Sequence, residues 1–239
     1  MYRPCASYAD QSKCVSELAD ACVALKARLG CSAADARTVA LDNLTAIARS
    51  GQMMLNLFDS WAKGDELIRQ VIPQLLGLKT VTPDGVRIAG DMLNKTAKLS
   101  LVVLAEFQVE NALRNFAREL GLPEAGTGFY RCASAVLGAL SIPSDRMDIL
   151  NTAARIRNSL HANGIHRRQH PSEQARVTIL GVTYEFVDGQ PVSCASWEHI
   201  AHALEASVGV LDEICFTPKV RAIPDPMMDQ YAWEQVTRP

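Results

Sequence analysis

Small and apolar side chains recur three and four residues apart along most of this chain, and this spacing limits what the chain can fold into. Over Asp10 to Leu29 and over Ala33 to Ala48, alanine and leucine dominate and no proline interrupts either stretch. Side chains spaced in this way share one face of an α-helix, so two helices separated at Gly30 are predicted. The pattern indicates a mostly α protein without a central parallel sheet.

The same spacing returns further along the chain. It predicts a helix over Asp65 to Leu76, then a turn at Pro83-Asp84-Gly85, then a long helix over Val86 to Leu120. Three more helices are expected, over 127–140, 144–162 and 196–214. The second of these should have its N-cap at Ser144 and end at about residue 162, where Asn163-Gly164 provides a stop. The proline-bearing tail after them is expected to be loose.

One segment has a different character. Ala175 to Val192 is rich in β-branched and aromatic residues and has glycines at Gly181 and Gly189, which predicts a small antiparallel hairpin or a three-stranded meander. The turn near residue 80 is the best internal boundary. It divides the chain into an N-terminal helical segment, 1–80, and a helical domain, 81–239, with the hairpin near 175–192.

Charge and hydropathy exclude several classes of protein. Lys and Arg number 24 against 26 for Asp and Glu, so the whole surface cannot be basic, and contact with nucleic acid would need a local patch. The longest strongly apolar run, Leu99 to Phe107, is far shorter than the roughly 20 residues that span a bilayer. No transmembrane helix or secretory leader is expected, and the predicted compartment is the cytoplasm.

The cysteines do not indicate a metal centre. There are seven, with no C-x-x-C pair, and the five histidines do not supply a complete ligand set near them. His199 and His202 are three apart without a third ligand, so they are interpreted as surface residues. Reduced thiols, no metal and no cofactor are expected.

Chemistry concentrates in one basic run. Arg155 to His170 (RIRNSLHANGIHRRQH) holds four arginines and three histidines and no acidic residue. On a helix, Arg157 and His161 share one flank, which Asn158 also reaches. An arginine fork and an imidazole suit phosphodiester cleavage without a metal. The alternative is structural: the arginines pair with Asp145, Asp148 or Glu110, and His161 caps a carbonyl.

The stretch Arg155 to His161 (RIRNSLH) resembles the R-x(4-6)-H signature of HEPN domains, in which an arginine, commonly followed by a polar residue, precedes histidine near a helix end. Arg155 fits the spacing. Arg157, followed by Asn158, fits the polar follower but leaves only three residues before His161, so both arginines remain candidates. The likeness extends over about 86–214, and it implies a HEPN-like helical bundle to which the hairpin and an N-terminal helical segment are added.

The resemblance implies a metal-independent endoribonuclease, of the kind that acts as a toxin or antiviral effector, built as a homodimer with a composite cleft. Its catalytic residues would be Arg155 or Arg157, Asn158 and His161, and Glu110 would support the arginine from an earlier helix. His166, Arg167 and Arg168 would add RNA contacts. The alternative function is a non-catalytic module that binds RNA, a nucleotide or a protein partner such as an antitoxin; a purely structural role is a third.

Overall fold

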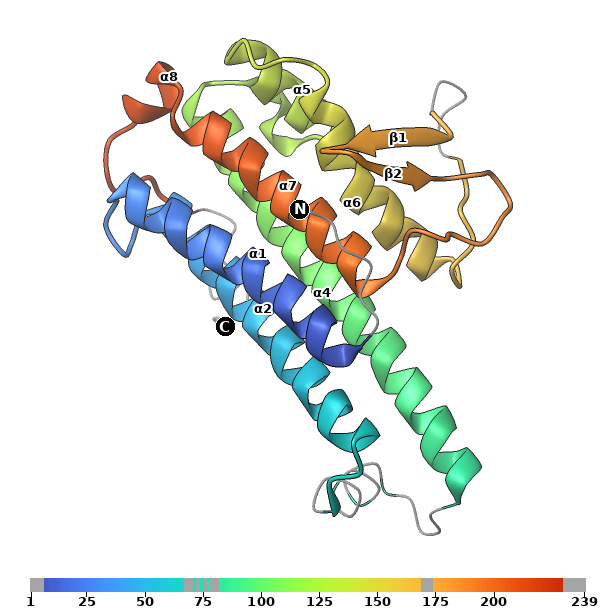
Figure 1. Ribbon diagram of the computed structural model, residues 1–239. Coiled ribbons are helices and arrows are strands. Elements are labelled where there is room, and N and C mark those ends of the chain that lie inside the picture. The colour runs from blue at the N-terminus through green and yellow to red at the C-terminus, as the bar shows by residue number, and fades with distance from the viewer. Residues whose placement is uncertain are drawn as a thin grey trace.

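The computed structural model describes residues 7–66, 71, 74, 77, 82–168 and 174–229. The protein is mostly α-helical with one small antiparallel sheet, as the sequence predicts (Figure 1). Most of the helix predicted over 65–76 lies outside the described residues. Among the described residues, none of the helices combines the length and the apolar character that a membrane-spanning helix needs.

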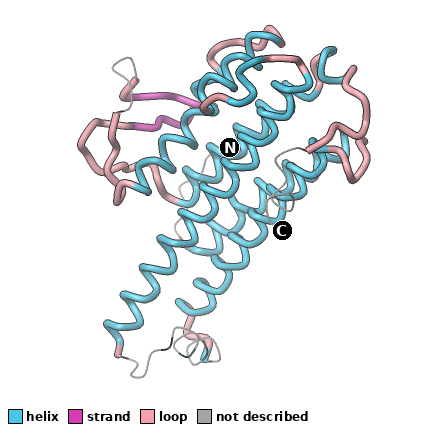
Figure 2. Tube along the Cα trace, turned by 180° about the vertical axis from the view of Figure 1, so that it is seen from behind, coloured by secondary structure: helices cyan, strands magenta, loops and turns pink. Residues whose placement is uncertain are grey.

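Four long helices lie side by side and form the bundle: α1 (Tyr8–Leu29), α2 (Ala36–Ala62), α4 (Pro83–Glu119) and α7 (Trp197–Cys215) (Figures 1 and 2). The helix predicted to end at Ala48 continues through Gly51 to Ala62. A Cβ at Gly51 would make ordinary van der Waals contact, 3.5 Å from Val15 and 3.6 Å from Trp197, so this position of α2 packs directly against α1 and α7.

The start of α4 corrects the predicted turn at Pro83-Asp84-Gly85. Thr82 is the N-cap, and its hydroxyl accepts a hydrogen bond from the Gly85 amide at 3.1 Å. Proline suits the first helical position, where its missing N–H has no partner to lose, and Asp84 suits the first turn. The three residues that resemble a turn therefore begin the 37-residue helix.

A second group of elements covers one side of α4 and α7 (Figure 1): a 3-10 turn η1 (Pro123–Gly126), α5 (Phe129–Ala139) and α6 (Arg146–His161). The N-cap of α6 is Asp145 rather than Ser144, and its side chain makes no capping hydrogen bond. The predicted stop is confirmed, because Asn163 and Gly164 adopt positive φ of 57° and 81° after the helix.

The hairpin consists of β1 (Arg176–Ile179) and β2 (Val182–Glu185), which pair antiparallel with Ile179 opposite Val182. Leu180 and Gly181 both have positive φ, 47° and 85°, as a two-residue turn between twisted strands requires. Alternate side chains, including Val177 and Tyr184, are buried, so one face of the hairpin joins the core.

One hydrophobic core connects all these elements. Residues from both sides of the predicted boundary at residue 80 enter it, among them Leu18 and Leu44 on one side and Phe116 and Leu204 on the other. Residues 8–62 are therefore packed into the same core as the helices of 83–215.

The tail expected to be loose is held in place as far as residue 229. It forms a short helix, α8 (Pro218–Arg221), and continues to Met227, which is buried in the core. The Met227 carbonyl accepts a hydrogen bond from the Ala36 amide at 2.8 Å, which ties the tail to the start of α2.

Candidate functional site

The candidate site lies at the end of α6, where Arg157 and His161 stand one helical turn apart. The apolar side chains Leu150, Ala153 and Ile156 are buried, so the same helix presents Arg157 and His161 on its flank. The Arg157 side chain is 25% exposed and His161 is exposed at the last position of the helix. Both can therefore meet a molecule from solvent.

Two neighbours hold Arg157. Its Nη1 lies 2.8 Å from Oε2 of Glu106 on α4, and its Nε donates to Oδ1 of Asn158 at 3.1 Å. Glu106 is only 4% exposed, so it contacts the arginine from the protein interior. The guanidinium of Arg157 is thus held by Glu106 from the interior and by Asn158 from its own helix.

This contact corrects the expected role of Glu110. The Glu110 carboxylate accepts hydrogen bonds from Arg114, 2.6 Å to Nη2, within α4. Glu106, one turn earlier on the same helix, makes the contact with the motif helix instead. A glutamate from an earlier helix does contact Arg157, but that residue is Glu106 and not Glu110.

Glu106 titrates in an unusual range. Burial raises its pKa from 4.5 to about 8, although the charge of Arg157 lowers it, and the charge of Glu110 adds to the rise. A protonated Glu106 can still accept a hydrogen bond from Arg157 through its carbonyl oxygen. Near neutral pH it can therefore orient the guanidinium without cancelling its positive charge.

Arg155 contacts a different part of the molecule, the residues on either side of the hairpin. Its Nη1 donates to the Gln174 carbonyl at 2.9 Å, and its guanidinium lies 5.2 Å from the centre of the Phe186 ring. Both contacts are with the hairpin region. Arg155 is therefore engaged in attaching the hairpin to α6, whereas Arg157 lies on the flank with His161.

The residues after α6 divide into buried and exposed ones. His166 is only 3% exposed, with Nδ1 3.3 Å from the Ser159 hydroxyl and its ring 5.3 Å from that of Phe186, so the expected RNA contact through His166 is wrong. Arg167 and Arg168 are exposed, as that expectation requires.

The basic run also meets acidic groups that are distant in sequence. Asp188 Oδ1 accepts a hydrogen bond from the Arg168 amide at 2.9 Å, and this bond and the nearby arginines lower the pKa of Asp188. Asp145, one of the partners considered for the arginines, contacts Arg146 at 3.1 Å instead. The His161 side chain makes no hydrogen bond with the residues that the structure describes.

Two histidines interpreted as surface residues are covered to different extents, which corrects that interpretation: His202 is buried and His199 is half-buried. His202 is 7% exposed and its Nδ1 lies 2.8 Å from the Tyr184 hydroxyl, while His199 Nδ1 lies 2.6 Å from the Ser196 hydroxyl. Burial lowers the pKa of both rings. Both contact Tyr184 of β2 and so help to attach the hairpin to α7.

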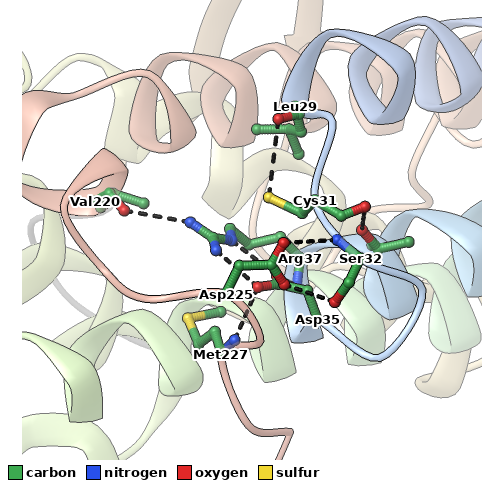
Figure 3. Close-up of polar contacts among 9 residues, drawn as sticks. Leu29, Cys31, Ser32, Asp35, Arg37, Val220, Asp225 and Met227 are labelled. Carbon is green, nitrogen blue, oxygen red and sulfur yellow. Dashed lines mark hydrogen bonds and ion pairs between the residues drawn. The ribbon is translucent and has the colours of Figure 1, made fainter.

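A second polar cluster, which the sequence pattern did not indicate, joins the α1–α2 loop to the tail (Figure 3). Asp35 is fully buried and accepts hydrogen bonds from Arg37 (2.7 Å to Nη2) and from the Met227 amide (2.8 Å). Burial alone would raise the pKa of Asp35, but these hydrogen bonds outweigh it and hold the pKa below its usual value. Its only sequence signal is the N-cap position before α2.

Cys31, Asp35 and Asp225 in this cluster lie close enough to share a metal ion. Their atoms are otherwise engaged, however. Both Asp35 oxygens accept hydrogen bonds from Arg37, and the Asp225 oxygens accept from the amide and hydroxyl of Ser32 at 2.8 and 2.6 Å. The hydrogen bonds account for the cluster as a clamp on the tail (Figure 3).

No protein-family model, no curated protein and no solved structure matches this chain.

Proposed function

We propose that the protein is a metal-independent endoribonuclease of HEPN type. The observation that carries the proposal is that Arg157 and His161 lie one turn apart on α6. Buried Glu106 and neighbouring Asn158 hold Arg157, and His161 is exposed. A fixed guanidinium beside a solvent-accessible imidazole is the combination that phosphodiester cleavage without a metal uses.

In the proposed reaction the 2′-oxygen of RNA attacks the adjacent phosphorus, and the bond to the 5′-oxygen of the next nucleotide breaks. A base removes the proton from the 2′-hydroxyl and an acid gives a proton to the departing 5′-oxygen, which leaves a 2′,3′-cyclic phosphate. Arg157 binds the non-bridging oxygens and stabilises the developing charge, Asn158 orients Arg157, and His161 moves protons.

The reaction needs two proton-transfer groups, and one chain supplies a single His161 at this position. A homodimer that brings two α6 helices together supplies both. On α4, Leu104 and Phe107 are 50% and 41% exposed and lie three residues apart on one helical face. We propose that this apolar pair lies in the dimer interface, where burial of its surface favours association.

Arg167 and Arg168 extend the positive surface and would contact the RNA backbone outside the cleft. Asp188 beside them reduces their net charge, so we expect their contribution to be smaller than that of Arg157. An endoribonuclease of this kind would suit a toxin or antiviral effector restrained by a protein partner such as an antitoxin.

The test is cleavage of mixed single-stranded and transfer RNA in EDTA. His161→Ala should lower the rate by about 10²- to 10⁴-fold, the contribution of a positioned acid or base. Arg157→Ala should be similarly costly, and Arg157→Lys should restore little because the planar fork is lost. Arg155→Ala is the matched control: it removes an arginine two residues away on the same helix and should leave the chemical step nearly unchanged. Equal melting curves would show that the variants are folded.

Full activity in His161→Ala would refute the nuclease mechanism. If the wild type binds RNA without cutting it, a non-catalytic binding module replaces the nuclease. In that case affinity should fall steeply with salt, because each phosphate contact releases counterions. Absence of both cleavage and salt-dependent RNA binding would leave a nucleotide, a protein partner or a purely structural role.

A further inference from the structure

A groove lies at the end of the bundle where α1 and α7 begin and α2 ends, against α4. It consists of two cavities of about 480 and 330 Å³ that adjoin at Tyr8 and Ala62, which line both. Sites of this size hold small molecules. The candidate nuclease residues do not line it, so the groove is separate from the proposed cleft.

The smaller cavity has aromatic walls. Tyr8, Phe58 and Trp61 line it, and the Tyr8 and Phe58 rings are 5.6 Å apart. Gly90 of α4 faces Trp61, since a Cβ at Gly90 would lie 3.6 Å from the indole ring. Because residue 90 has no side chain, one wall of the cavity stays open beside the indole. Such walls favour a flat apolar group.

The larger cavity is lined mostly by polar residues and contains one cation available for a ligand. Lys98 lines it, and no carboxylate among the described residues lies within 4 Å of its ammonium group. Asp59, the acidic residue in the same lining, already binds Lys63 at 2.6 Å. Burial lowers the pKa of Lys98, although the charge of Glu198 opposes this, so the ammonium is partly desolvated without a close counter-ion.

Two amides complete the polar cavity. Asn94 Oδ1 accepts a hydrogen bond from Trp197 Nε1 at 2.7 Å, which directs the amide and leaves its NH₂ group as a donor. Gln11 Oε1 is buried and accepts no hydrogen bond from the described residues. A buried acceptor without a donor is destabilising, and a ligand that donates a hydrogen bond would relieve this.

We propose that this groove binds a small aromatic anion, whose planar body lies among Tyr8, Phe58 and Trp61 and whose carboxylate or phosphate binds Lys98. A donor group on the ligand would satisfy Gln11. This site is independent of the proposed nuclease activity, and its test does not depend on RNA cleavage.

The test uses 8-anilinonaphthalene-1-sulfonate, a planar aromatic anion that fluoresces in apolar surroundings, titrated into the full chain. Two of the protein's three tryptophans, Trp61 and Trp197, line the groove, so energy transfer from tryptophan should accompany binding. We expect saturable binding of one probe per chain. Lys98→Gln should weaken it about tenfold, as expected for loss of a charge-assisted hydrogen bond. Gly90→Leu should abolish it by filling the aromatic cavity.

Two matched controls separate this site from general surface binding. Lys95→Gln removes the same charge from an exposed position of α4 that does not line the groove, and Gly209→Leu adds the same side chain at an exposed position of α7 with open space around it. Both should bind the probe like the wild type. Equal affinity in Lys98→Gln or Gly90→Leu, or equal weakening in the controls, would overturn the proposal.

Displacement of the probe then identifies the anionic group. Competition by 2-naphthoate alone indicates an aromatic carboxylate, and competition by adenosine monophosphate indicates a nucleotide-like phosphate; either result supports the aromatic-anion site. Failure of both to displace the probe at millimolar concentration would contradict it.

Discussion

The buried carboxyl of Glu106 should make the stability of this protein depend on pH, and Glu106→Gln should remove that dependence. Glutamine has the same shape and keeps an oxygen that can accept the hydrogen bond from Arg157 Nη1, now 2.8 Å from Glu106 Oε2. It differs from glutamate in being unable to ionise. The substitution therefore isolates the cost of charging a side chain that is 4% exposed.

The direction in which stability changes with pH follows from the pKa values of Glu106 in the unfolded and folded states. In the unfolded chain Glu106 ionises near its ordinary value of 4.5, whereas in the folded chain burial raises its pKa to about 8. Below pH 4.5 both states carry the proton and the group does not affect stability. Between the two values only the folded state keeps the proton, so the free energy of unfolding falls as pH rises; above about 8 the loss is complete.

The magnitude follows from the same values. The interval from 4.5 to about 8, at roughly 1.4 kcal/mol per pH unit, gives an upper value of about 5 kcal/mol. Relaxation of Arg157, whose side chain is 25% exposed, and entry of water would reduce it. We expect Glu106→Gln to be nearly neutral at pH 4.5 and more stable than the wild type by about 2–5 kcal/mol at pH 9.

Urea unfolding, followed by far-ultraviolet circular dichroism from pH 4.5 to 9, measures this difference. Comparing variant and wild type at each pH cancels the other titrating groups. Glu110→Gln is the control, because its ion pair with Arg114 lies nearer the surface and its loss should cost about 1 kcal/mol or less. A Glu106→Gln difference that stays constant across the pH range would refute the reasoning.

Three further outcomes are expected. Asp35→Ala should lower the free energy of unfolding by about 3–5 kcal/mol, because it leaves Arg37 buried without its partner, and a loss below 1 kcal/mol in urea would contradict the clamp. Tyr184→Phe should cost about 1 kcal/mol in the same assay, since it removes the hydroxyl that contacts the His202 ring and the His199 carbonyl; an unchanged midpoint would argue against a stabilising role for these contacts. Phe107→Glu should keep the chain monomeric in light scattering while the wild type dimerises, and a monomeric wild type would exclude the composite cleft.

Much of the fold could be predicted because its causes are local. The spacing of apolar residues determines which face of a helix can be buried, and this required no knowledge of the partner helix. The hairpin was likewise visible, because Gly181 provides the positive φ that a tight turn needs. Errors occurred where a local signal has two uses: Pro83-Asp84-Gly85 suits a turn and also the first turn of a helix, and the Thr82 cap favoured the helix.

The candidate site was only partly predictable. The sequence by itself placed Arg157 and His161 on one flank of a helix, because residues four apart share a face. It could not choose between Glu106 and Glu110, which are one turn apart, or about 6 Å along α4. Glu106 meets Arg157 because of where α6 packs along the length of α4, and that position is determined by side chains from the whole core.

The environment of the basic run was also decided by tertiary structure. As a sequence, Arg155 to His170 contains no acidic residue, but the fold brings Glu106 and Asp188 to it and buries His166 against Phe186, which follows β2. Burial and charge compensation depend on residues distant in sequence, whereas periodicity depends on neighbours. The sequence therefore determined the helices and the faces they bury, while the choice of ion-pair partners and the burial of each titratable group came from how those helices meet.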